Sequence, residues 1–190
     1  MQRRAIALIC LALALVLVMT SCSRDRDDRT TMATTTSTTE ATPTTDPTIA
    51  VVLLSGRLNV GGNALVFGAP RSQVSSYLGR ALGPPRSERE QSCDAGELHT
   101  MTWPGIVAYV GDEGFAGWSA DGPTFTTDTG GVRIGSTRQE LLAAYPAATI
   151  TESTLGTELS IETPPPGLSG ILDADGHITA LWSGATCVAR

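Results

Sequence analysis

The chain has 190 residues, of which 41% are hydrophobic and only 17% are charged, with a formal net charge of −6 at pH 7. Its positive side chains are all arginines, and they are scattered along the chain rather than gathered in one segment. Proteins that bind nucleic acids rely on a basic patch or stripe to contact the phosphate backbone. The charge pattern therefore excludes a nucleic-acid partner.

The first 21 residues have the pattern of a secretion signal. Arg3 and Arg4 give a positive start, and the segment Ala5–Val18 is apolar without interruption. This segment is shorter than the roughly 20 residues that a membrane-spanning helix needs. A charged start followed by a short apolar core is typical of a signal peptide. An uncleaved signal anchor is the alternative.

The signal ends in a motif for lipid attachment. Met19-Thr20-Ser21-Cys22 resembles a bacterial lipobox, in which a signal peptidase cuts just before a cysteine that carries a diacylglycerol thioether. Leucine is the usual residue at the position of Met19. Two acyl chains on one residue are enough for stable anchoring. We predict a lipoprotein held in the cell membrane through Cys22, on the extracytoplasmic face; ordinary cleavage with an incidental Cys22 is the alternative.

Residues 22–48 form a polar segment dominated by threonine. Such a segment holds too few apolar side chains to offset the entropy that ordering it would cost. We therefore predict a disordered tether that spaces a globular domain, residues 49–190, from the lipid surface.

The cysteines indicate one disulfide. Cys10 leaves with the signal and Cys22 carries the lipid, so Cys93 and Cys187 remain. Two cysteines in an oxidising compartment most simply pair with each other. A loop of this length would stabilise the fold by about 4–5 kcal/mol in the chain-entropy model. The alternative is two buried free thiols.

The globular domain contains a short internal similarity. The segments Leu65–Pro85 and Val132–Ala148 both read as a strand, a glycine and a helix, and Arg71 of the first aligns with Arg138 of the second. In the second segment, the T-x-x-E sequence that starts at Thr137 is a capping box for the start of a helix. The pattern predicts two short helices.

Strand patterns follow each predicted helix. Turns with the sequences GDEG, at Gly111–Gly114, and DADG, at Asp173–Gly176, separate apolar or alternating segments, which favours antiparallel hairpins. A further hairpin is expected to join Val51–Leu54 to Leu65–Phe67. We predict an α+β fold of two tandem repeats, about 49–124 and 125–190, each a short helix followed by antiparallel strands. The helices are expected to pack on one face of the sheet.

This repeated pattern resembles the tandem-repeat architecture of β-lactamase-inhibitor-like proteins, and is similar to small outer-membrane assembly lipoproteins that use one such unit. The stretch GGVRIGSTRQELLAAYP, with a mid-repeat and a C-terminal cysteine, also resembles uncharacterised secreted or lipid-anchored actinobacterial proteins. The resemblance places the glycine, the helix cap and the cysteines. It implies no reacting group, and nothing here matches an inhibitory loop.

The sequence predicts no catalytic residue, metal site or cofactor. His99 and His177 are the only histidines, and a zinc site would need further ligands at a defined spacing. Asp173 and Asp175 echo part of an EF-hand loop, but the pattern is not completed, so a turn is the preferred interpretation. The G-x-S-x-G motif of serine hydrolases is absent. We predict a protein that is not an enzyme.

Four aromatic residues in predicted strands, Trp103, Tyr109, Trp118 and Trp182, have two interpretations. They pack in the core, or part of the set lines an open sheet face and anchors a protein partner. We favour a lipid-anchored protein-binding or envelope-assembly module whose partner is another envelope protein. The alternatives are a small-ligand receptor or enzyme with a pocket between the repeats, and a structural spacer in the envelope.

Overall fold

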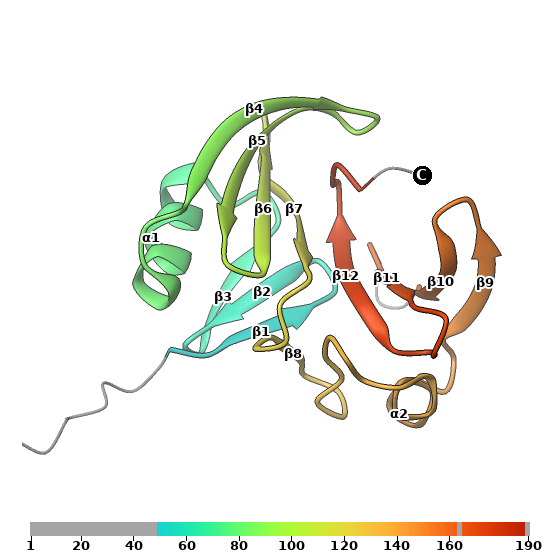
Figure 1. Ribbon diagram of the computed structural model, residues 1–190. Helices are drawn as coiled ribbons and strands as arrows, with labels where there is room; N and C mark the ends of the chain where they lie inside the picture. The colour runs from blue at the N-terminus through green and yellow to red at the C-terminus, as the bar shows by residue number, and fades with distance from the viewer. Residues whose placement is uncertain (1–48, 163–164, 189–190) are drawn as a thin grey trace, which may run out of the picture. The chain divides into compact units, whose positions relative to one another are not determined.

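The computed structural model describes residues 49–162 and 165–188 (Figure 1). The predicted signal peptide (1–21), the lipidation site Cys22 and the tether (22–48) lie outside these residues. Within the described ranges, no helix combines the length and the apolar character that a membrane span needs.

The described residues fold into a mostly β structure with twelve strands and two helices. A four-stranded sheet has the order β3-β2-β1-β8, and an eight-stranded antiparallel sheet has the order β4-β5-β6-β7-β12-β11-β10-β9. The smaller sheet contains β1 (Val51–Leu54), β2 (Arg57–Val60), β3 (Asn63–Val66) and β8 (Thr126–Thr127). The larger sheet contains β4 (Ser87–Cys93), β5 (Gly96–Trp103), β6 (Ile106–Gly111), β7 (Gly114–Ala120), β9 (Thr149–Ser153), β10 (Gly156–Ile161), β11 (Leu168–Leu172) and β12 (Ile178–Gly184).

The predicted fold class, α+β with two tandem helix-plus-strand repeats, is wrong. The protein is mostly β, and its first strands build a separate mixed sheet that the predicted repeats do not contain. The helices also do not share one face of one sheet. Helix α1 (Arg71–Leu82) contacts β2, β3 and β7, whereas the start of α2 (Arg138–Ala144) is held at the turn before β12, far from α1 in Figure 1. The similarity between the two strand–glycine–helix segments shows only that the same elements follow one another along the chain. It does not determine which strands pair with each other to form the sheets.

The opening hairpin is also different from the prediction. Strand β1 pairs with β2, which lies in the segment Arg57–Val60 that the sequence pattern left unassigned, and β3 pairs with the other edge of β2. The cause is the shortness of these strands. With four residues each and glycine-containing turns between them, they carry too little alternation to be separated by pattern.

The locally encoded features are confirmed. Both helices form where expected, and the capping box at the start of α2 is complete: the Thr137 Oγ1 atom accepts from the Glu140 amide at 3.2 Å, and the Glu140 carboxylate accepts from the Thr137 amide at 2.7 Å. The turn Gly111–Gly114 joins β6 to β7. Gly114 has a φ of +102°, and a Cβ there would lie 2.6 Å from the Ala69 carbonyl oxygen, so this turn requires glycine.

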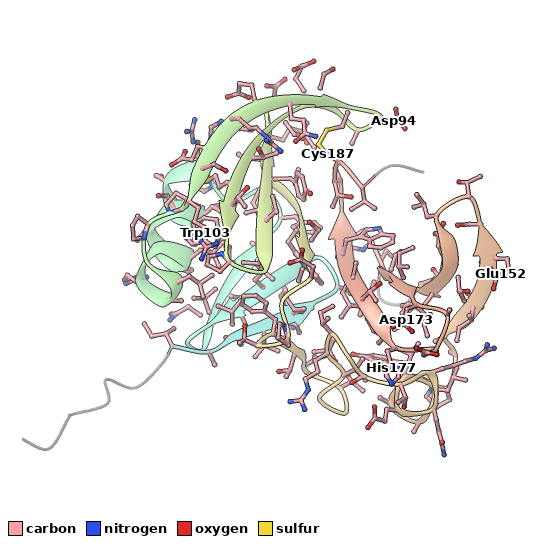
Figure 2. The ribbon with its side chains drawn as sticks, viewed as in Figure 1. Asp94, Trp103, Glu152, Asp173, His177 and Cys187 are labelled. Atoms are coloured by element: carbon pink, nitrogen blue, oxygen red, sulfur yellow. A yellow bond between two sulfur atoms is a disulfide. The ribbon has the colours of Figure 1, made fainter. Side chains whose placement is uncertain are left out.

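The eight-stranded sheet joins two successive four-stranded meanders through β7 and β12. These strands pair in antiparallel register, with Ser119 opposite Trp182 and Trp118 opposite Ser183. The predicted disulfide between Cys93 and Cys187 is present, with a Cα–Cα distance of 5.3 Å. It ties the tip of the β4–β5 hairpin to the segment that follows β12, as the yellow sulfur atoms beside Cys187 show in Figure 2.

The main core gathers side chains from both sheets and both helices. Two indole groups in it also make polar contacts to neighbouring elements. Trp103 Nε1 donates to the Gly83 carbonyl at the end of α1 (2.8 Å), and Trp118 Nε1 donates to the Leu54 carbonyl at the end of β1 (3.2 Å). Each indole therefore buries its rings and has a partner for its N–H.

A buried serine connects the small sheet to the large one. Ser183, on β12, is 2% exposed; its hydroxyl donates to the Gly167 carbonyl at 2.6 Å and accepts from the Gly56 amide at 3.1 Å. The Gly167 amide in turn donates to the Ser55 hydroxyl at 3.0 Å. The β1–β2 turn is thus held to β12 and to the residue that precedes β11. We call these four residues the Ser183 clamp.

We expect Ser183→Ala to destabilise the protein by about 1–3 kcal/mol, because it leaves the buried Gly167 carbonyl and the partly buried Gly56 amide without their partner. Urea unfolding followed by circular dichroism measures the change. The control is Ser72→Ala on the exposed surface of α1, for which we expect at most about 0.5 kcal/mol. Equal stability of the two variants would contradict the proposed importance of the clamp.

Candidate functional site

The aromatic residues predicted as interface anchors are buried. Trp103, Trp118, Trp182 and Tyr109 are 1%, 0%, 2% and 6% exposed. The interface prediction is therefore wrong for these residues, and the core interpretation applies. Figure 2 shows Trp103 beside α1, where its indole meets Gly83.

The physical reason is that both faces of the large sheet are covered around its centre. Trp182 and Trp118 project to opposite faces, because Trp182 pairs with Ser119 while Trp118 pairs with the neighbouring Ser183. Trp182 and Tyr109 are buried outside the main core cluster, and the Tyr109 hydroxyl forms a 3.0 Å hydrogen bond with Ser119. Alternation in sequence distinguishes two faces of a strand, but it does not say whether one or both are covered.

His99 belongs to a chain of charged groups at the edge of the large sheet. Its Nδ1 lies 2.7 Å from a Glu90 carboxylate oxygen and its Nε2 lies 3.0 Å from a Glu88 oxygen, which also accepts from Arg71 at 2.7 Å. The pKa of the Glu88 carboxyl is lowered, first by the hydrogen bond from Arg71 and then by that from His99. A hollow of about 510 Å³ lies beside this chain. Arg71 and His99, which line this hollow, are already bound to the carboxylates of Glu88 and Glu90.

The lowered pKa of Glu88 predicts that the free energy of unfolding depends on pH. Glu88 stabilises the fold when ionised, so its contribution is present above its ordinary pKa of 4.5 and is lost as the pH falls through the lower folded value. We expect Glu88→Gln to lower the free energy of unfolding at about pH 7 and to have a smaller effect at about pH 3, measured by urea unfolding. Glu162→Gln, at an exposed position, serves as the control. A Glu88→Gln effect that does not change with pH would refute this account.

Asp173 and His177 form a turn, as predicted. The Asp173 carboxylate accepts from the amides of Asp175 (3.0 Å) and His177 (2.8 Å), and the hydrogen bond from His177 is the main reason that the pKa of Asp173 is lowered. Figure 2 shows both side chains beside α2. In the described part of the chain, no group of three or more histidine, cysteine or acidic side chains is arranged to hold a metal ion.

A different cavity, which we call the junction pocket, lies where the small sheet meets the end of the β10–β11 hairpin. Its volume is about 360 Å³. It is lined by Leu53, Leu54, Ser55, Arg57, Asp128, Thr129, Tyr145, Ile161 and Leu168. Leu53, Ile161 and Leu168 are almost completely buried and form an apolar floor.

Strand pairing brings these residues together from distant parts of the chain. Ile161 and Leu168 form the last pair of the β10–β11 hairpin, and Tyr145 is the C-cap residue of α2. Leu54 pairs with Arg57 across the β1–β2 turn, and the parallel pairing of β1 with β8 places Leu53 beside Thr127. The pocket therefore depends on contacts between segments about a hundred residues apart.

The rim of the pocket carries two charged side chains of opposite sign. Arg57 and Asp128 are both exposed, and none of the ion pairs found among the described residues includes either of them. The Asp128 carboxylate accepts only the Thr129 hydroxyl, at 3.3 Å, among the side-chain hydrogen bonds of this region. An apolar floor with a few polar groups at the rim is the usual composition of a small-molecule site.

No signal in the sequence points to Arg57 or Asp128. Each lies in a segment that reads as turn or link, without motif or periodicity. The sequence offers a pocket between the repeats only as an alternative and indicates no residue that would line it. The two residues come to one pocket because β2 and β8 both pair with β1, and the β1–β8 pairing involves only two residues of β8, which leave no recognisable pattern.

Comparisons with known proteins give little further information. No protein-family model and no curated protein matches the chain. Among solved structures, an uncharacterised protein of Escherichia coli, yfeY, is similar over 58% of this chain and 88% of its own, with 12% identity and a TM-score of 0.40. The resemblance to β-lactamase-inhibitor-like and actinobacterial proteins is not tested by these comparisons and stays a prediction.

Proposed function

We propose that this protein is a lipid-anchored, extracytoplasmic receptor that takes a small ligand into the junction pocket. The observation that carries the proposal is the presence of Arg57 and Asp128, which join no ion pair among the described residues, beside apolar side chains in one cavity of about 360 Å³. This volume lies at the lower end of the range for ligand pockets, about 300–1,000 Å³, and so suits a small molecule.

Two further observations support a receptor over the other functions considered. The aromatic residues expected to anchor a protein partner are buried, which removes the main argument for the envelope-assembly module. The side chains that line the pocket include no histidine or cysteine that would activate or act as a nucleophile. Binding is therefore better supported than catalysis.

Filling the pocket tests the proposal. We expect Leu54→Trp to abolish ligand binding, because Leu54 lines the cavity and the larger side chain would occupy it. The assay is ligand-observed NMR with a fragment library of apolar, anionic, cationic and zwitterionic compounds. Val66→Trp, at an exposed position on β3 outside the pocket, is the matched control. Fragments that bind the wild type and both variants equally, or no bound fragment at all, would rule out a receptor function for this pocket.

The anchoring is tested separately. We expect Cys22→Ala to move the protein from the membrane fraction to the soluble extracytoplasmic fraction, because the diacylglycerol chains supply the membrane affinity. Cell fractionation and the intact mass of the exported protein measure the change. Cys93→Ala, which keeps Cys22, should stay with the membrane. A Cys22→Ala protein that still fractionates with the membrane would show that another anchor holds it.

A further inference from the structure

We infer that the ligand of the junction pocket is a small zwitterion with an apolar side chain, such as a free α-amino acid of the leucine type. In this arrangement Arg57 binds the carboxylate, Asp128 binds the ammonium group, and the apolar floor takes the side chain. The inference rests on the proposed receptor function and specifies its ligand class.

The strand pairing brings the two charged residues to one pocket from the two sides of β1. Arg57, the first residue of β2, pairs directly with Leu54. On the other side of β1, Leu53 pairs with Thr127 in parallel register, and Asp128 follows Thr127 in the bend after β8. Arg57 and Asp128 therefore come from the two strands that flank β1, and both line the pocket.

The chemistry of each group matches one end of the ligand. A guanidinium presents two parallel N–H donors that fit a carboxylate, and a carboxylate accepts well from the three N–H donors of an ammonium group. Leu53, Ile161 and Leu168, which line the same pocket, offer a surface for a branched aliphatic side chain. A ligand with only one charge would leave either Arg57 or Asp128 without a partner.

The hollow beside His99 does not share these properties. There, Arg71 and His99 are already bound to Glu88 and Glu90, so a ligand would have to displace an existing contact. At the junction pocket, charges of both signs stand next to apolar surface and join no ion pair within the part of the chain that the structure describes.

The test is an ¹⁵N–¹H NMR titration of the exported domain with three ligands of one shape. These are L-leucine, 4-methylpentanoate, which lacks the ammonium group, and 3-methylbutan-1-amine, which lacks the carboxylate. Exposed ion pairs are individually weak, so we expect leucine to bind only about 2–5-fold more tightly than either half-ligand. The shifted resonances should include the amides of β1 and β8.

Two charge variants assign the roles. Arg57→Gln should remove the preference for leucine over the amine, and Asp128→Asn should remove the preference for leucine over the acid. Arg89→Gln and Asp94→Asn, exposed positions away from the pocket, should leave both preferences unchanged. The ¹⁵N–¹H spectrum of each variant also shows whether it is folded.

The outcomes separate this inference from the function on which it rests. Equal affinity for all three ligands, or no binding of leucine while other fragments still enter the pocket and are lost in Leu54→Trp, would overturn the zwitterion inference and leave the receptor function intact. If neither these ligands nor any library fragment binds, both proposals fail.

Discussion

The contact on which the rest of the structure depends is the buried hydroxyl of Ser183. It lies on β12 where the two halves of the large sheet meet, and its two hydrogen bonds reach the β1–β2 turn at Gly56 and the start of β11 at Gly167. Its neighbour across the sheet, Trp118, adds a hydrogen bond to Leu54. Apolar packing between sheets is not directional. These polar contacts are directional and so determine how the sheets are aligned.

The junction pocket follows from this alignment. The turn that the Ser183 clamp holds lies between Leu54 and Arg57, and the same clamp positions Gly167 next to Leu168 of the pocket floor. The walls of the pocket are therefore tied to each other through a few buried hydrogen bonds. A site supported in this way keeps its shape, so less conformational entropy is lost when a ligand binds and the binding free energy is more favourable.

The two charged regions of the surface show why a count of charged residues is a poor guide to a site. Around His99, the Arg71 guanidinium and the His99 imidazole are each bound to a carboxylate at 3.0 Å or less, and these hydrogen bonds lower the pKa of Glu88. Such a cluster stabilises the local fold. At the junction pocket, Arg57 and Asp128 take part in no ion pair among the described residues, and Asp128 accepts only the Thr129 hydroxyl, so most of their hydrogen-bonding capacity is available to a ligand.

The sequence by itself determined the features that depend on residues close in the chain: the two helices, the capping box at Thr137 and the glycine turns. It also determined the Cys93–Cys187 disulfide, because the signal peptide and the lipid account for the other two cysteines. Only the tertiary structure decided the mostly β architecture, the covering of both faces around Trp182, and the placing of Arg57 and Asp128 at one pocket. Caps and turns involve hydrogen bonds within a few residues, so short patterns encode them. The pairing of distant strands depends on many small contacts summed over the whole fold. A strand of two residues, such as β8, is too short for its pairing with β1 to be predicted from the sequence.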